Sequence, residues 1–352
     1  MVSEACSYCY TSCMSKDDTW FLKGIAIILL LYHHNPFDSD YGFVLKSAAR
    51  VCVWIFVFIS AYGFSLQMKD KYEKKPVRFV IKRILLLYAQ MWFFYLFNLT
   101  VHIIWDRSLI TYFTSNAFNL PVDMLGLYST FGKPEIASYW YVNFLIIVIL
   151  IFPLLYYLAK WISWFSIPAV MAAVLLCPYK MTFLHGGQLN YYLLMVLAGI
   201  LFAQKNVFER LARFRQKKAF LVLTGSLVLL SVLVVVRYIL LPHTEEKWYL
   251  NIGPVSTVMA LMIIILVFLY RKEGKISELI QKLGTHSGNI FFIHWFFYNY
   301  LRVVLNIKIE ILCFLGCFAY CLAVSMLVEF IKKKTGYNEK IRKGLKVLLR
   351  EK

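Results

Sequence analysis

Apolar runs of about 17 to 23 residues, each bounded by charged positions, recur along the chain from residue 21 to residue 330. An α-helix of that length crosses the roughly 30 Å hydrocarbon core of a bilayer. The pattern therefore predicts an all-α fold, a polytopic membrane helix bundle with about ten transmembrane helices. We expect these helices near residues 20–35, 48–67, 80–103, 139–158, 161–178, 190–204, 219–241, 252–270, 288–305 and 309–330.

The composition agrees with this pattern and excludes an ordinary water-soluble domain. Of the 352 residues, 61% are hydrophobic and only 16% are charged, whereas soluble domains carry about 25% charged residues. No polar stretch is long enough to form a separate folded domain. We therefore expect a cytosolic N-terminal segment at residues 1–19, one membrane domain at residues 20–330 and a basic cytosolic tail at residues 331–352.

The net charge of +19 predicts the orientation of the chain in the membrane. With both termini in the cytoplasm, 29 of the 38 Lys and Arg residues fall on the inner side and 9 on the outer side, as the positive-inside rule requires. The cations lie between apolar segments and form no basic stripe with interleaved aromatic residues, so we expect no nucleic-acid partner. We expect a multi-pass protein of the plasma or inner cell membrane, with the lipid bilayer as its partner.

The first apolar segment is expected to remain in the mature protein. It lacks the small-x-small cleavage site of a signal peptide and ends in YHHNP at residues 32–36. His34 follows Lys23 by eleven positions, which at about 100° per residue places both side chains on one helix face about 16 Å apart. Polar side chains at membrane depth are costly and often mark function. The structural alternatives are an interfacial anchor for Lys23 and a helix-end residue with a hydrated tip for His34.

The eight cysteines predict neither a disulfide framework nor a metal site. Cys6, Cys9 and Cys13 lie in the predicted cytosolic segment, where thiols stay reduced. Their spacing fits part of a metal site, but no fourth ligand is nearby, so we expect free or lipidated thiols and assign no metal. Another group recurs every four residues from Cys313 to Cys321, which is typical of small side chains at a helix interface.

The segment from Lys23 to His34 resembles the opening of the acyltransferase 3 family, integral membrane O-acyltransferases that often modify bacterial surface polysaccharides. The family begins with a basic residue, a Gly, an apolar stretch and a His eleven positions after the base, which match Lys23, Gly24 and His34. Many members have Arg where Lys23 stands. The next helix is rich in aromatic residues and ends in Ser60-Ala61, where the family usually has Ser-Gly.

A basic cluster before the third helix is the next part of the resemblance. Arg78, Lys82 and Arg83 stand where the family often carries Arg-x-x-Arg, and Leu86 replaces the second Arg. Counterparts of later family segments follow in order along the chain. They are Trp140, Asn143 and Pro153, then Leu283, Gly284, Ser287 and His294, and finally Ser325 with Glu329. The resemblance thus covers roughly residues 20–330.

The resemblance implies an O-acyltransferase that uses acyl-CoA, most often acetyl-CoA, as a co-substrate on the cytosolic side. No permanently bound cofactor is implied. The acceptor implied by the family is a hydroxyl of a sugar in a cell-surface or exported polysaccharide, reached from the other face. Such a hydroxyl is a weak nucleophile at neutral pH, so a nearby base is required, and neutral histidine is well suited to that role.

These requirements assign roles to the matching residues. His34 is the expected base or transient acyl carrier, and it ranks above His33, which points about 100° away. Lys23 is the expected cation that favours the donor and the developing oxyanion. The donor phosphates are assigned to Arg83, Lys82 and Arg78, although these cations equally serve as a topology signal. Substrate binding is assigned to Trp140, Asn143, His294 and Ser60, with helix packing and interhelical hydrogen bonds as the alternative.

Two other functions remain open at this level. A transporter or flippase of a lipid-linked glycan or of an acyl donor would also need ten helices with polar residues at membrane depth. A non-catalytic relative would tolerate Lys23, Ala61 and Leu86 in place of the common family residues. Transport does not call for a cation and a histidine three turns apart in the first helix, and no pair of broken helices matches between two halves of the chain. The acyltransferase is therefore the favoured prediction.

Overall fold

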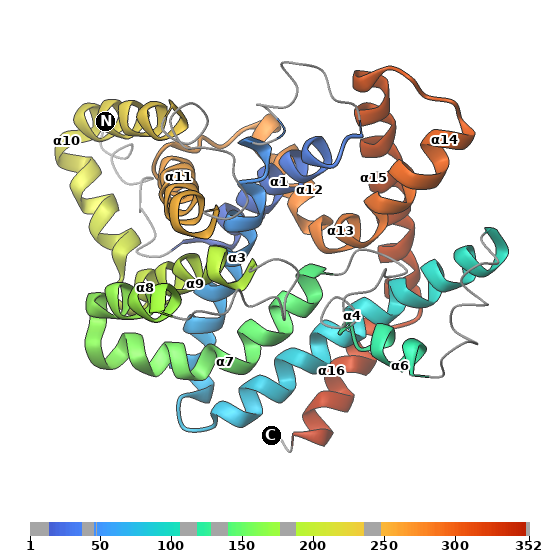
Figure 1. Ribbon diagram of the computed structural model, residues 1–352, viewed down its shortest axis with the longest axis horizontal. Coiled ribbons are helices and arrows are strands. Elements are labelled where there is room, and N and C mark those ends of the chain that lie inside the picture. Colours follow the sequence, from blue (N-terminus) through green and yellow to red (C-terminus); the bar gives the residue numbers. More distant parts are fainter. Residues whose placement is uncertain are drawn as a thin grey trace, which may run out of the picture.

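The computed structural model describes residues 14–36, 46, 48–105, 118–127, 140–176, 188–235 and 248–349 (Figure 1). Within these ranges the regular structure consists of α-helices with short 3-10 and π segments, and no β-strand occurs in them. The prediction of an all-α fold is therefore confirmed. The cysteines at positions 6, 9 and 13 lie outside the described residues.

Each of the ten predicted apolar segments contains a helix. They are α1 (Lys16–His33), α3 (Cys52–Gln67), α4 (Pro76–Trp105), α7 (Trp140–Ile162), α8 (Ser166–Leu176), α9 (Gln188–Gln204), α10 (Val207–Val235), α11 (Trp248–Tyr270), α13 (Ser287–Phe296) and α15 (Glu310–Lys334). The largest shift is in α10, which begins twelve residues before the predicted 219 because a charged, amphipathic stretch extends the apolar run.

Five helical stretches in the described part of the chain are long and apolar enough to cross a membrane. They are Cys52–Tyr72, Pro76–Leu96, Trp140–Ala173, Gly253–Tyr270 and Glu310–Lys334. A sixth is reached if Tyr192–Gln204 and Val207–Arg213, which are bent by 68° relative to each other, form one broken span. These segments make the chain a membrane protein, but the predicted number of ten spans is not confirmed.

The predicted spans that fail this test do so for identifiable reasons. Helix α1 carries Lys16, Asp17, Asp18 and Lys23 within its 18 residues. Helix α8 has 11 residues and does not count as a separate span, because the stretch Trp140–Ala173 runs from α7 into α8. The predicted helix at 288–305 is divided into α13, a π-helix at Phe297–Leu301 and α14 (Arg302–Val304).

Three described helices were not predicted because their sequences are not continuously apolar. Helix α6 (Asn119–Met124) lies in the predicted loop at 104–138, and α12 (Lys275–Thr285) and α16 (Tyr337–Leu348) are amphipathic. Helix α6 is held against α4 by the hydroxyl of Tyr95, which donates to Asp123 Oδ2 at 2.8 Å. Helix α16 lies beneath α4 in Figure 1, and the hydroxyl of Tyr337 donates to the carbonyl oxygen of Ala89 at 2.6 Å.

The closest helix contact in the bundle is between α1 and α12, and glycine makes it possible. A Cβ atom added at Gly24 would collide with the carbonyl oxygen of Ile280, and one added at Gly284 would collide with the carbonyl oxygen of Trp20. Both helices therefore approach through backbone rather than through side chains, as in the small-residue interfaces of membrane helices. The two family positions Gly24 and Gly284 thus have a packing role.

Polar contacts fix the start of α1 within this crossing. Ser15 and Asp18 form a capping box, in which each side chain accepts a hydrogen bond from the other's backbone N–H. Asp18 also pairs with Arg271, whose Nε lies 2.8 Å from the Asp18 Oδ1. Arg271 follows α11 and donates to Ser277 of α12 at 3.2 Å. The buried pair thereby ties together the ends of α1, α11 and α12.

A polar network, buried except at Glu329, joins α13 to α15. Asn289 donates to Ser325 at 3.0 Å and to Glu329 at 2.8 Å, and His286 Nδ1 lies 2.8 Å from the Ser325 hydroxyl. Lys332 Nζ donates to Asn289 at 3.0 Å and lies 3.3 Å from Glu329. Lys332 is only 6% exposed. Helix α15 therefore continues to Lys334, past the predicted start of the tail at residue 331.

The α1–α12 crossing makes the substitution Gly284→Ala a direct test of the fold. The added methyl group must displace the backbone of α1, and overpacking of this kind costs about 1–3 kcal/mol. We expect a lower unfolding temperature for the purified protein in detergent. Gly225→Ala is the matched control, because a Cβ added at Gly225 meets nothing within 4 Å and alanine favours a helix interior. Equal unfolding temperatures for both variants would contradict the assigned packing role.

Candidate active site

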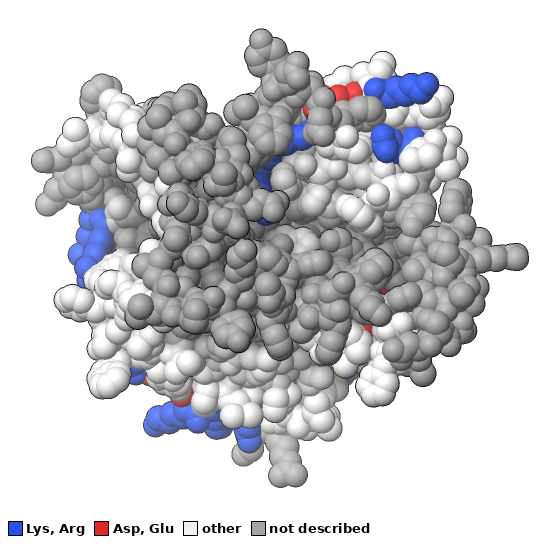
Figure 2. Space-filling model, in the orientation of Figure 1, with Lys and Arg blue, Asp and Glu red and all other residues white. Residues whose placement is uncertain are grey.

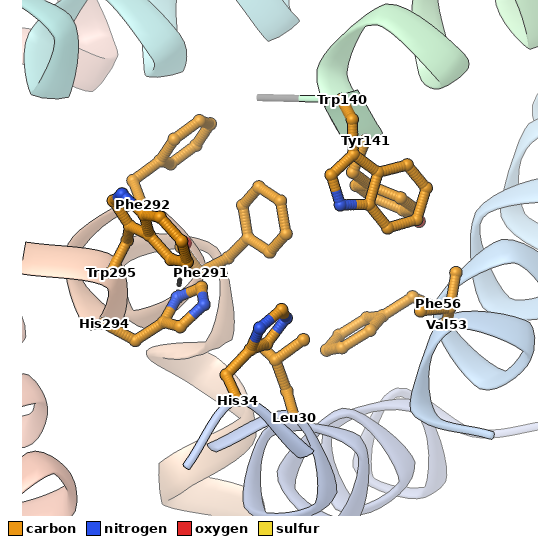
Figure 3. Close-up of a pocket in the computed structure, with 10 residues that line it drawn as sticks. All are labelled: Leu30, His34, Val53, Phe56, Trp140, Tyr141, Phe291, Phe292, His294 and Trp295. Atoms are coloured by element: carbon orange, nitrogen blue, oxygen red, sulfur yellow. Dashed lines mark hydrogen bonds between the residues drawn. The ribbon is translucent and has the colours of Figure 1, made fainter. Parts of the chain in front are cut away.

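A small cavity lies where the end of α1 meets α3, α7 and α13. Its volume is about 30 Å³ (Figure 3). The lining residues are Leu30, His34, Val53, Phe56, Trp140, Tyr141, Phe291, Phe292, His294 and Trp295. A volume of this size is comparable to that of a few water molecules.

His34 is the residue that the end of α1 presents to this cavity. It is the C-cap of α1, and its backbone N–H donates to the carbonyl oxygen of Leu30 at 3.0 Å. The chain after it is held by Asn35, whose side-chain amide donates to the carbonyl oxygen of Glu310 at 3.1 Å. The backbone at His34 is therefore held on both sides of the helix end. The adjacent His33 turns elsewhere, and its Nδ1 lies 2.9 Å from the carbonyl oxygen of Lys46.

His294 brings a second imidazole to the same cavity. The ring centroids of His34 and His294 are 5.0 Å apart, with an angle of 46° between the ring planes. Figure 3 shows the two rings next to each other, with Trp140 and Tyr141 on the opposite side of the cavity. On the α13 side, His294 Nδ1 lies 2.8 Å from the carbonyl oxygen of Phe291 and 3.3 Å from that of Ile290.

The remaining wall is mostly aromatic. Trp140 stacks on Tyr192 at 6.3 Å, and Phe292 stacks on Phe94 at 5.3 Å between ring centroids. The hydroxyl of Tyr141 is buried and forms no hydrogen bond of good geometry with the described residues. Such a wall excludes bulk water, which strengthens electrostatic interactions inside the cavity.

The predicted substrate residues are therefore only partly brought together. Trp140 and His294 line the cavity beside His34. Asn143 is fully buried one turn further along α7 and does not line the cavity, and Ser60 lies behind Tyr141 on α3. Sequence reasoning missed Tyr141, although it stands inside the Trp140–Asn143 family segment. The aromatic residues of α3 and α13 in the wall carried no signal that separates them from ordinary core residues.

The predicted donor residues lie away from the cavity that contains His34, and none of them lines it. Lys23 is eleven residues before His34 in one unbroken helix, a separation of about 16 Å. Arg83 lies over the ring of Phe64, 4.8 Å from its centroid, and Lys82 Nζ donates to the hydroxyl of Tyr72 at 2.7 Å. Neither Lys23 nor Arg78 forms a hydrogen bond or ion pair with the described residues.

The order of the helices explains why these cations share one end. The end of α1 and the start of α3 both line the cavity, so the two helices run in opposite directions. Helix α4 follows α3 through a π-helix at Met68–Tyr72 and a short turn, and it runs back again. Lys23 and Arg83 each lie about two turns from the start of their helix, away from the cavity.

A surface cluster of cations lies at this same end. The turn between α3 and α4 carries exposed Lys69, Lys71, Lys74 and Lys75. In Figure 2 a patch of Lys and Arg side chains lies at the lower edge of the molecule, where Figure 1 draws that turn, and others lie at the left edge and at the upper right. Among the described residues, no group of three or more His, Cys, Asp or Glu side chains is placed to hold a metal ion.

Comparison with known proteins identifies the family of the chain. Among curated proteins and among solved structures, none matches the chain significantly. A family model does match, the acyltransferase domain of the acyltransferase 3 family, and it covers residues 21–330. The matched region begins in α1 and ends within α15, so it contains the cavity, both imidazoles and the basic end of the molecule. The chain therefore belongs to the acyltransferase 3 family and is a membrane acyltransferase.

Proposed function

We propose that this acyltransferase moves an acyl group, in the simplest case acetyl, from acyl-CoA to a sugar hydroxyl of a cell-surface or exported polysaccharide. The observation that carries the proposal is the position of His34. Its imidazole lies in a small aromatic cavity, at the opposite end of α1 from Lys23 and the basic surface. This separation suits a reaction in which a charged donor and a sugar acceptor approach from different sides.

In the proposed reaction His34 acts as the general base. Its bare ring nitrogen takes the proton of the acceptor hydroxyl while the hydroxyl oxygen attacks the thioester carbonyl carbon. The C–S bond then breaks, the sulfur leaves with the electron pair, and the imidazolium returns the proton to it as the thiol. The products are an ester and free CoA. Trp140, Trp295 and Tyr141 supply the other hydrogen-bond donors in the cavity wall, which are suited to the developing oxyanion.

The basic end of the molecule is the proposed site for the donor phosphates. Arg83 has a planar guanidinium that binds phosphate oxygens in pairs, and Phe64 supports it from one side. Lys23 and Arg78, which have no described partner, and Lys82 add positive charge. Trp140 is the proposed acceptor contact in the cavity, with Asn143 and Ser60 behind the wall as supporting residues.

The orientation proposed for the chain follows the same charge distribution. We place both termini and the basic end in the cytoplasm, where acyl-CoA is found, and the cavity toward the outer half of the plasma or inner membrane. The excess of cations on the inner side supports this orientation. The bundle of about ten spans and the division into residues 1–19, 20–330 and 331–352 belong to the same proposal.

His34→Ala is expected to abolish acyl transfer, because loss of a general base costs about 10²- to 10⁴-fold in rate. The measurement is the acetyl content of surface polysaccharide from cells that lack the protein and are supplied with wild type or variant at matched membrane levels. His33→Gln is the control, since His33 does not line the cavity. Full acetylation with His34→Ala would contradict the mechanism. A fall in glycan amount at unchanged acetylation per sugar would favour the transporter.

Arg83→Gln is expected to raise the KM for acyl-CoA by about 10-fold to 100-fold, the contribution of one hydrogen bond to a charged group. The effect on kcat should be smaller, because Arg83 does not line the cavity that contains His34. Arg213→Gln is the control, because Arg213 is an exposed residue of α10 paired with Glu209. An unchanged KM in Arg83→Gln, measured with purified protein, would limit Arg83 to a topological role.

A further inference from the structure

The surroundings of His294 determine which of its two nitrogens carries the hydrogen. Its Nδ1 lies 2.8 Å from the carbonyl oxygen of Phe291 and 3.3 Å from that of Ile290. Carbonyl oxygens only accept hydrogen bonds, so Nδ1 of the neutral ring must be the donor. The other nitrogen, Nε2, is therefore bare and accepts hydrogen bonds. His294 is 6% exposed and lines the cavity beside His34, with 5.0 Å between the ring centroids.

No comparable contact fixes the tautomer of His34. Its ring nitrogens form no hydrogen bond with any described residue, although the ring is packed against His33 and His294. The neighbouring polar groups are engaged elsewhere. His33 Nδ1 faces the carbonyl oxygen of Lys46, and the Tyr298 hydroxyl donates to the carbonyl oxygen of Leu31 at 2.6 Å. A general base needs one bare nitrogen directed at its substrate, so something must hold the hydrogen on the other.

We propose that His294 is the positioning residue for His34. Its Nε2 accepts the N–H of His34, which leaves the second nitrogen of His34 bare and directed into the cavity. The 5.0 Å between ring centroids is short enough for a direct N–H···N hydrogen bond once the His34 ring turns about its χ2 angle. This inference rests on the proposed function, because it assigns a role relative to the base of that reaction.

The proton balance of the reaction explains what His294 contributes. When His34 takes the hydroxyl proton, both of its nitrogens carry hydrogen and the ring becomes a cation. A hydrogen bond from that cation to His294 Nε2 is stronger than one from the neutral ring, so it stabilises the transition state more than the ground state. His294 neither gains nor loses a proton in this step, and its hydrogen remains on Nδ1. A buried carboxylate in the same place would itself need a partner, whereas a neutral imidazole does not.

The helix that carries His294 is anchored on both sides of the residue. On the N-terminal side of His294, the side-chain amide of Asn289 donates hydrogen bonds to Ser325 and Glu329 of α15. Next to it, Phe292 stacks on Phe94 of α4, with 13° between the ring planes. The two backbone carbonyls that hold Nδ1 belong to the same anchored turn. The bare nitrogen is therefore held in one direction, as a positioning role requires.

The test uses three substitutions that differ in which nitrogen of the imidazole they imitate. His294→Gln would place an amide oxygen where Nε2 lies, while His294→Asn imitates only Nδ1 and His294→Leu imitates neither. We expect His294→Leu and His294→Asn to lower kcat by about 10-fold to 100-fold, with little change in the KM for acyl-CoA. We expect His294→Gln to recover most of the loss. The measurement is steady-state kinetics on purified full-length protein, at matched unfolding temperatures.

The double variant His34→Ala/His294→Leu separates this inference from the proposed function. If His294 acts through His34, the double variant is no slower than His34→Ala alone. A further loss in the double variant, an equal loss in all three single variants, or a wild-type kcat in His294→Leu overturns the positioning role. Wild-type activity in His34→Ala overturns the proposed base instead, whatever the His294 variants do.

Discussion

The contact on which the rest of the structure depends is the crossing of α1 and α12 through Gly24 and Gly284. Helix α1 carries Lys23 toward one end of the molecule and His34 toward the other, so any movement of α1 moves both. A membrane helix gains little from burying apolar surface, because lipid is as apolar as a leucine side chain. Close backbone packing and polar contacts must therefore hold α1 in place. The glycine crossing provides the close backbone packing, and the ion pair of Asp18 and Arg271 provides the polar contact.

The polar groups inside the bundle are of two kinds, those that have hydrogen-bond partners in the protein and those that have none among the described residues. At the base of α13, Asn289, Ser325, Glu329 and Lys332 satisfy one another, as a stable buried network requires. In the cavity, His34 has no such partners among the described residues. The network around Asn289 holds α13 in place. The missing partners leave the ring nitrogens of His34 available to a substrate. The proposed mechanism needs both, since a freely moving imidazole would lose its direction and a fully hydrogen-bonded one would lose its basicity.

The sequence predicted the all-α fold and most of its helices, and it singled out His34, which lines the cavity. Long apolar runs identify helices such as α7 and α15 without tertiary information. Helices α12 and α16 were missed because an amphipathic helix on a membrane protein has no continuous apolar signal. His34 was identified by its spacing from Lys23 within one helix. The partnership of His34 with His294 depends on how α1 packs against α13, and no pattern within either helix reveals that contact.

The small cavity and the distant cations together limit how the proposed substrates can be held. A volume of about 30 Å³ has no space for a nucleotide or a sugar ring. In the proposed reaction the charged part of the donor binds among the cations, of which Lys23 lies about 16 Å from His34 along α1, and its thioester reaches the cavity. Binding energy from the distant phosphates then serves to place the reacting carbon beside the imidazole. In this proposal Lys23 and His34 serve different parts of the donor from one helix, while the other cations come from α4 and the second histidine from α13.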